Sequence, residues 1–450
     1  MKQNKDYLIT EKPSRALLIF SIPMIIGNLF QQAYTIVDSA IVGRYVGETA
    51  LAAVGASYSL TSIFICIAIG GGIGASVIIS HHFGAHNYGR MKTCIRTALL
   101  SFLFISLILG GIGLIFSQQI MEVLNTPADA IDIAVTYLNI YFLGLPFLFM
   151  YNILSSMFNA LGESRIPLYL LIFSSVLNIF LDLYMVAVLN LGVAGAAYAT
   201  FIAQGISAVL SLIIFVVTLQ QLQGKAEGWF SKTEFSDMSR IALPSILQQS
   251  TVSIGMMLVQ SVVNSFGTQI LAGFSAAMRI ESLCVVPMSA IGNAMSSYTA
   301  QNIGAEKEER ISQGYRAGNF MIIVIAAILC FFLEIAHKPL IALFLDNEPS
   351  AQTIVTGESY LKFIGFFFCM IGFKMAVDGI LRGAGAVRVF TIANLVNLTL
   401  RVTIAKFGAP IWGVSMVWYA VPLGWLANFL ISYGYYRTGK WKEAVSKTVD

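Results

Sequence analysis

The chain has 450 residues, of which 57% are hydrophobic and 11% charged, and its 27 basic and 23 acidic residues give a net charge of +4. Soluble globular proteins are typically about 25% charged, so this composition excludes a soluble enzyme, a disordered protein and a nucleic-acid-binding protein. A membrane span requires about 20 apolar residues, and the hydrophobic content suffices for roughly a dozen spans. The sequence therefore predicts an integral membrane protein.

Apolar blocks follow one another along the chain, separated by short polar segments. The first block is longer than the hydrophobic core of a signal peptide, so we expect it to stay in the mature protein. Only helices or closed barrels satisfy their backbone in lipid, and these blocks are too long for barrel strands. The predicted fold is an all-α bundle of twelve transmembrane helices, at approximately 16–42, 51–80, 95–116, 132–157, 167–189, 192–219, 241–265, 270–300, 313–336, 357–381, 389–406 and 411–435.

The basic residues near the ends of the blocks predict the orientation. With a cytoplasmic N-terminus, twenty of the 27 Lys and Arg residues fall on inside segments and four on outside segments or outer ends of spans. Cytoplasmic loops carry an excess of Lys and Arg, so we expect both termini in the cytoplasm. The compact loops and the lack of organelle signals favour a bacterial plasma membrane.

The chain also contains an internal repeat, with a shift of about 220 residues between its halves. We expect a six-helix lobe at 1–219, a cytoplasmic linker at 220–238 and a second six-helix lobe at 239–450. Because six spans is an even number, both lobes enter from the cytoplasm and are related by a pseudo-two-fold axis along the membrane normal. The residues that match between the halves include Pro23 and Pro244, Gly72 and Gly292, Arg90 and Arg310, and Gly162 and Gly385.

Two such lobes are the architecture of secondary transporters, which open one face at a time. The alternative is an ancient duplication without moving parts. The nucleotide-binding motif GxxxxGK followed by Ser or Thr does not occur, and neither HExxH nor GxSxG is present. The five cysteines are scattered in or beside apolar runs and predict buried hydrophobes, not a disulfide or metal framework. We therefore expect a transporter driven by an ion gradient, without enzymatic activity.

Four polar residues in the first half are predicted to share one depth in the outer part of the membrane. They are Asp38 in the first span, Asn178 and Asp182 in the fifth, and Thr200 in the sixth. An ionisable residue inside a span is costly, and by default it marks a functional site. Two carboxylates, an amide and a hydroxyl suit a hard cation, and two close acids equally suit a shared proton. The alternative is a set of local hydrogen bonds that does not titrate.

The second half does not repeat this pattern. Arg401 stands where the shift places Asn178, and Arg279 and Glu281 are predicted at a similar depth. We expect these three to form a buried ion-pair cluster that locks the lobe, with substrate contact as the alternative. Lys374 and Asp378 are four residues apart and are expected to pair with each other. A role of this pair in a second proton step is the alternative.

Three histidines, His81, His82 and His86, close the second span in an HHxxxH pattern. No cysteine or carboxylate stands near them in the sequence to complete a metal site. We therefore expect a solvated helix end and no bound metal.

Several segments, in this order, resemble the multidrug and toxic compound extrusion (MATE) family over essentially the whole chain. They are VDSAIVGR at 37–44, LAAVG at 51–55, FGA at 83–85, QNIGA at 301–305 and LRGAG at 381–385. The resemblance implies a twelve-helix transporter that exports organic cations or amphipathic drugs in exchange for H⁺ or Na⁺ and needs no other cofactor. A single chain carries both lobes, so we expect it to function as a monomer in the bilayer.

The resemblance also implies which residues bind the coupling ion. Family members with a cation site in the N-terminal lobe use an Asp on helix 1, an Asn-xxx-Asp on helix 5 and a Thr on helix 6, and Asp38, Asn178, Asp182 and Thr200 match these types and positions. Another branch uses a Glu on helix 7 and an Asp within helix 10. Here helix 7 has no acid and Asp378 lies near the inner end of helix 10, which argues against a cation site in the C-terminal lobe.

The alternative function within the same superfamily is a flippase or exporter of a lipid-linked or other amphipathic metabolite. Such proteins generally have a strongly cationic central cavity, whereas the candidate cavity residues here are acidic or neutral. A membrane enzyme or receptor without a transport cycle has no motif in its favour.

Overall fold

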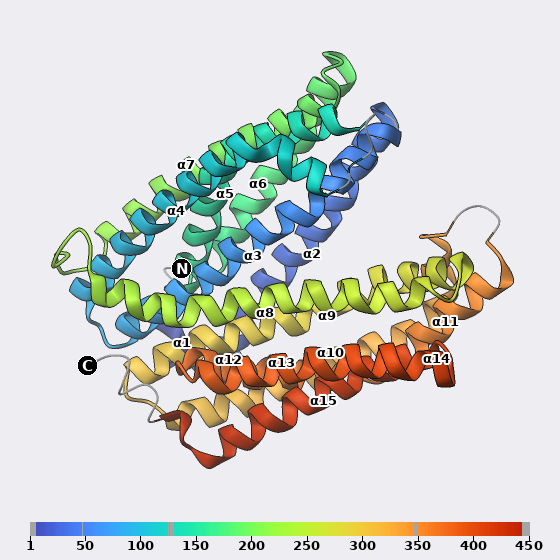
Figure 1. The fold of residues 1–450 in the computed structure, drawn as a ribbon. Coiled ribbons are helices and arrows are strands. Elements are labelled where there is room, and N and C mark those ends of the chain that lie inside the picture. Colours follow the sequence, from blue (N-terminus) through green and yellow to red (C-terminus); the bar gives the residue numbers. More distant parts are fainter. Residues whose placement is uncertain (1–5, 47, 125, 127–129, 346–348, 443–450) are drawn as a thin grey trace. The chain divides into compact units, whose positions relative to one another are not determined.

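The computed structural model describes residues 6–46, 48–124, 126, 130–345 and 349–442, and the described part is helical throughout its regular structure (Figure 1). The expected all-α fold is confirmed. The elements are α1 (Tyr7–Thr10), α2 (Pro13–Tyr45), α3 (Glu48–Gly84), α4 (Tyr88–Val123), α5 (Ile131–Ala160), α6 (Arg165–Asp182), η1 (Leu183–Val188), α7 (Gly192–Gln220), α8 (Lys232–Asn264), α9 (Thr268–Gly304), α10 (Glu309–Ala342), α11 (Ala351–Gly365), α12 (Phe368–Gly383), α13 (Val387–Thr403), η2 (Ile404–Gly408), α14 (Ala409–Trp412) and α15 (Ser415–Thr438).

Among the described residues, eleven helical segments are long and apolar enough to cross a membrane, and a bent pair of shorter helices makes a twelfth. The predicted number of spans is thus confirmed. The tenth span differs from the continuous helix expected at 357–381, because α11 and α12 meet at an angle of 52°. Its two halves are separated only by Phe366 and Phe367, which are as apolar as their neighbours, so hydropathy did not reveal the break.

The helices form two compact units. One consists of Ile26–Ile246 and the other of Met1–Ile25 together with Leu247–Asp450; we refer to them as the first lobe and the second lobe. The chain passes between the lobes inside α2 and inside α8. The domain limits expected from the sequence, at residues 219 and 239, stay a prediction.

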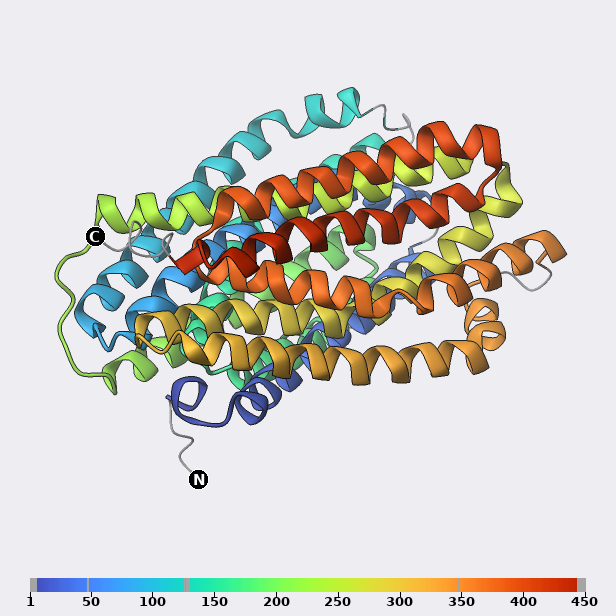
Figure 2. The same ribbon diagram turned by 90° about the horizontal axis from the view of Figure 1, so that it is seen from below.

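Matching glycines let matching helices approach closely in each lobe. A Cβ atom added at Gly72 of α3 would collide with the Ser156 side chain of α5, and one added at Gly292 of α9 would collide with the backbone of Met375 in α12. Small residues allow close backbone approach where helices pack in a membrane. The core of the second lobe also includes α13 and α15, which lie side by side (Figures 1 and 2).

The fifth span of each half ends in a π-helical segment. η1 continues α6 in the first lobe, and η2 continues α13 in the second. π segments are rare and occur frequently at functional sites. The residues just before η1 and those just before η2 therefore occupy corresponding positions in the two lobes.

Candidate functional site

The four polar residues predicted in the first lobe come from three helices. Asp38 lies on α2, Asn178 and Asp182 lie on α6, and Thr200 lies on α7. Residues four apart share a face of a helix, and both Asn178 and Asp182 are buried, with 2% and 0% of their surface exposed. The π segment η1 begins directly after Asp182. The structure brings these four residues together.

The side-chain amide of Asn178 connects the three helices. It lies 2.7 Å from the hydroxyl of Tyr34 on α2 and 3.3 Å from the hydroxyl of Thr200 on α7. When the amide nitrogen faces Asp182, it donates to the carboxylate Oδ2 at 2.8 Å and to the Tyr34 hydroxyl, while the amide oxygen accepts from Thr200. This orientation gives every polar atom of the amide a partner, so Asn178 fixes the position of the Asp182 carboxylate.

The carboxyl groups of Asp38 and Asp182 lie within hydrogen-bonding reach of each other. The Oδ1 atom of each is buried without a hydrogen-bond partner among the described residues. In the part of the chain that the structure describes, no basic side chain forms an ion pair with either carboxylate. Buried charges are normally paired or coordinate a cation. This pair therefore fits either a proton shared between two acids or a Na⁺ held by oxygen ligands.

Tyr34 belongs to this site and was not predicted from the sequence. A tyrosine in an apolar span is ordinary, so its chemistry gave no signal. Its spacing did, because it stands four residues before Asp38 and therefore on the same face of α2. Tyr137 on α5 also interacts electrostatically with both aspartates.

In the second lobe, Lys374 and Asp378 of α12 form a buried network with neighbouring helices. The Lys374 ammonium lies 3.1 Å from the Asp378 carboxylate and donates to the Asn394 side chain of α13 at 3.0 Å. Ser432 of α15 donates to the other oxygen of Asp378 at 2.7 Å. The charge of each side chain is therefore balanced within the lobe.

The three residues expected as one ion-pair cluster are placed differently. Glu281 of α9 is buried and accepts a hydrogen bond from the Tyr360 hydroxyl of α11 at 2.6 Å. Arg401 of α13 is also buried and interacts electrostatically with Glu281 without a direct ion pair. Arg279 lies apart from them with an exposed side chain. The reason is geometric, because residues two apart on a helix do not share a face.

The stretch between α7 and α8 is tied to α4 of the same lobe. The backbone N–H of Ser231 donates to the Thr97 hydroxyl at 3.0 Å, and that of Glu227 donates to the Thr93 hydroxyl at 2.9 Å. Lys92 donates to two carbonyl oxygens of the same stretch, each at 2.8 Å. A segment expected as a linker is thus fastened to the first lobe.

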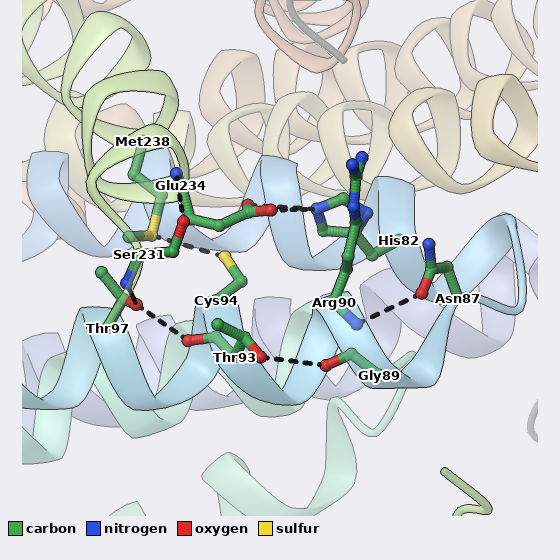
Figure 3. Close-up of polar contacts among 10 residues, drawn as sticks. All are labelled: His82, Asn87, Gly89, Arg90, Thr93, Cys94, Thr97, Ser231, Glu234 and Met238. Atoms are coloured by element: carbon green, nitrogen blue, oxygen red, sulfur yellow. Dashed lines mark hydrogen bonds and ion pairs between the residues drawn. The ribbon is translucent and has the colours of Figure 1, made fainter. Parts of the chain in front are cut away.

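The same region contains a buried pair between α3 and α8. The His82 Nε2 atom lies 3.1 Å and 3.2 Å from the two carboxylate oxygens of Glu234, and Figure 3 shows the two side chains pointing toward each other near Cys94. The expectation of a solvated helix end is wrong for His82, because Glu234, 152 residues further on, covers it. Among the described residues, no three His, Cys, Asp or Glu side chains are grouped to hold a metal.

We predict that Glu234→Ala lowers the thermal stability of the purified protein in detergent. The substitution leaves the buried His82 without its partner, and an unsatisfied buried polar group costs about 1–3 kcal/mol. Loss of the monodisperse chromatography peak with temperature measures the effect. Glu227→Ala is the matched control, since its exposed side chain lies in the same region; an equal loss in both variants would contradict the prediction.

A bundle of membrane-spanning helices with two close carboxylates that have no basic partner among the described residues is typical of membrane transport proteins, in which acids inside the membrane mark ion or substrate pathways. The MatE family model matches residues 23–184 and 244–406, one match in each half. The chain therefore belongs to the multidrug and toxic compound extrusion (MATE) family, whose members are transporters and not enzymes. The resemblance found in the sequence is confirmed.

Individual relatives agree with this assignment. The chain is 32% identical to the probable multidrug resistance protein YpnP of Bacillus subtilis strain 168, over 95% of this chain and 96% of that protein. It is 26% identical to the probable multidrug resistance protein YoeA of the same strain, over 100% of both. A solved structure described as the outward-facing conformation of a multidrug resistance MATE family transporter of the MOP superfamily superposes with a TM-score of 0.89 at 24% identity, covering 99% of this chain and 100% of that chain.

Proposed function

We propose that this protein exports organic cations or amphipathic drugs in exchange for H⁺ or Na⁺, and that Asp38, Asn178, Asp182 and Thr200 hold the ion. The observation that carries this proposal is the pair of buried Oδ1 atoms of Asp38 and Asp182, for which the described residues provide neither a hydrogen-bond donor nor an ion-pair partner. A proton or a Na⁺ supplies the missing positive charge. The multidrug resistance proteins among the relatives support the class of substrate.

The site couples the ion to the substrate through α2. Asp38 is on α2, whereas Asp182 and Asn178 are on α6, so the two carboxylates repel each other when the site is empty. An ion between them removes this repulsion and draws α2 toward α6. A ligand shifts a conformational equilibrium only by its different affinity for the two states, and the paired carboxylates provide that difference.

The transport cycle follows from this coupling. Ion uptake from the outside lowers the affinity for the cationic substrate, which then leaves to the outside. By reciprocity, substrate binding from the cytoplasm weakens the hold on the ion by the same factor. Twelve spans with both termini in the cytoplasm of a bacterial cell suit this direction of transport. Each chain carries both lobes, so we propose that it acts as a monomer.

Transport by purified protein in liposomes tests the proposal. Uptake of ethidium is followed under a pH gradient or a Na⁺ gradient, one at a time, with the wild type and with Asp38→Asn. We expect one of the two gradients to drive uptake by the wild type and neither to drive uptake by the variant, with both proteins equally monodisperse. The gradient that works identifies the ion.

Two outcomes would count against the proposal. Unchanged coupled uptake by Asp38→Asn would remove the assignment of the site. No uptake by folded wild-type protein under either gradient would favour the flippase alternative, in which the substrate is a lipid-linked or other amphipathic metabolite.

A further inference from the structure

Arg401 occupies, in the second lobe, the place that Asn178 has in the first. Gly162 and Gly385 both have positive φ values, 80° and 72°, and both precede the fifth span of their half. Asn178 stands 16 residues after Gly162, and Arg401 stands 16 residues after Gly385. The two side chains are buried, with 2% and 8% exposure, and both precede a π segment. The correspondence therefore holds in the structure as well as in the sequence.

The two lobes differ in whether their buried acids have basic partners. In the first lobe, Asp38 and Asp182 share a site without any basic partner among the described residues. In the second lobe, Asp378 has the Lys374 ammonium at 3.1 Å, and Glu281 interacts electrostatically with Arg401. The first lobe thus requires a cation from outside the protein, whereas the second lobe carries its cations on its own side chains.

The guanidinium group of Arg401 is buried, yet part of it has no hydrogen-bond partner among the described residues. Its Nε and Nη2 atoms are buried and have no hydrogen-bond partner in the part of the chain that the structure describes, although a guanidinium can donate five hydrogen bonds. A charged side chain inside a span is expensive and by default functional. Tyr360 and Glu281 hydrogen-bond to each other. Glu281 therefore compensates the charge of Arg401 through space and not through a direct contact.

We propose that Arg401 is a tethered cation, which takes in the second lobe the electrostatic role that the mobile ion takes in the first. This inference rests on the proposed function and adds a stoichiometry to it. Because Arg401 compensates Glu281 and Lys374 compensates Asp378, neither of these two buried acids, among the described residues of the second lobe, is left to hold a second ion. The transporter then exchanges one ion for one substrate molecule in each cycle.

A bound anion is the other partner that unpaired guanidinium donors attract. Glu281 argues against it, because a carboxylate interacting with Arg401 already supplies the negative charge and repels another. Arg401 and Glu281 form no direct ion pair, but the carboxylate still balances the charge of the guanidinium. Charge–charge interactions in a low-dielectric interior act beyond contact distance.

The net charge moved in each cycle tests the stoichiometry, whichever ion is used. Exchange of one monovalent substrate such as ethidium for one H⁺ or Na⁺ moves no net charge, so a membrane potential alone cannot drive it. Exchange for two ions moves one charge, and the potential then changes the ethidium accumulation ratio tenfold for about 59 mV. Liposomes with equal pH and Na⁺ on both sides receive a potential from K⁺ and valinomycin, and protein-free vesicles give the background.

One variant is designed to create a second ion site in the second lobe, and the others keep the positive charge that prevents one. Arg401→Asn combined with Ala405→Asp builds an Asn-xxx-Asp at two buried positions that correspond to Asn178 and Asp182. We expect the wild type to be unresponsive to the potential and this double variant to respond tenfold for about 59 mV. Arg401→Lys and the single variant Ala405→Asp keep a fixed positive charge and are expected to remain unresponsive.

Each result decides the matter. Ethidium movement driven by potential in the wild type or in Arg401→Lys would overturn the proposal, and so would an active double variant that stays unresponsive. If the double variant does not fold, the wild type and Arg401→Lys still decide. The absence of any gradient-driven transport by the wild type would instead overturn the proposed function, so the two failures are distinguishable.

Discussion

Asp182→Asn is expected to slow gradient-driven ethidium transport strongly while it still binds ethidium. Asp182 is completely buried, and its carboxylate faces Asp38 and the amide of Asn178. Asparagine keeps the shape of the side chain but removes one of the two negative charges. The site, with one carboxylate left, then has a much lower affinity for the ion. Coupling free energies of 1–3 kcal/mol correspond to about 5- to 150-fold in affinity. We expect the initial rate of coupled transport to fall by a factor in that range.

One further readout and one control variant separate this loss of coupling from a general loss of function. Ethidium binding without a gradient, followed by fluorescence, should be close to that of the wild type. Asp132→Asn is the matched control, because Asp132 is an exposed aspartate in the first turn of α5 and outside the site. Equal transport by Asp182→Asn and Asp132→Asn would show that Asp182 takes no part in coupling.

Lys374→Met is expected to destabilise the second lobe more than Glu234→Ala destabilises the first. It leaves the Asp378 carboxylate, which is 2% exposed, without its ammonium partner. Breaking a buried ion pair by removing one partner costs about 3–5 kcal/mol, whereas replacing both partners by apolar residues is often neutral. We therefore expect Lys374→Met to lower the unfolding temperature in detergent markedly, and Lys374→Met with Asp378→Leu to recover most of the loss.

The double variant distinguishes a structural pair from a second proton site. Coupled ethidium transport by Lys374→Met with Asp378→Leu should match the wild type once the protein is folded. A stable double variant without coupled transport would assign the pair to the transport cycle, as the alternative interpretation of the sequence holds.

The sequence predicted the fold and the grouping of polar residues at the candidate ion site for the same physical reason. Hydrocarbon tolerates neither an unsatisfied backbone nor an uncompensated charge, so twelve apolar blocks and the acids within them stand out without any structure. Asp38 and Asp182 were found this way. Tyr34 was not, because a phenol is not costly in a span. The bend between α11 and α12 was missed because Phe366 and Phe367 are apolar.

Contacts between distant segments were beyond the reach of sequence patterns. The sequence shows His82 as one of three neighbouring histidines, and only the fold brings Glu234 to it. The expected cluster of Arg279, Glu281 and Arg401 rested on depth alone. Depth does not specify the face of a helix, and Arg279 is exposed whereas Glu281 is buried on the same helix, α9.

The way the chain divides between the lobes bears on how a half-length ancestor could have folded. The start of α2, including Leu17 and Phe20, belongs to the core of the second lobe, while the start of α8 packs on α3 of the first lobe, where Gly74 lies against Ala242. In each half of the sequence, the beginning of the first long helix therefore packs in the lobe that is formed mainly by the other half. Two separate copies of one half would exchange these segments reciprocally, as domain-swapped dimers do.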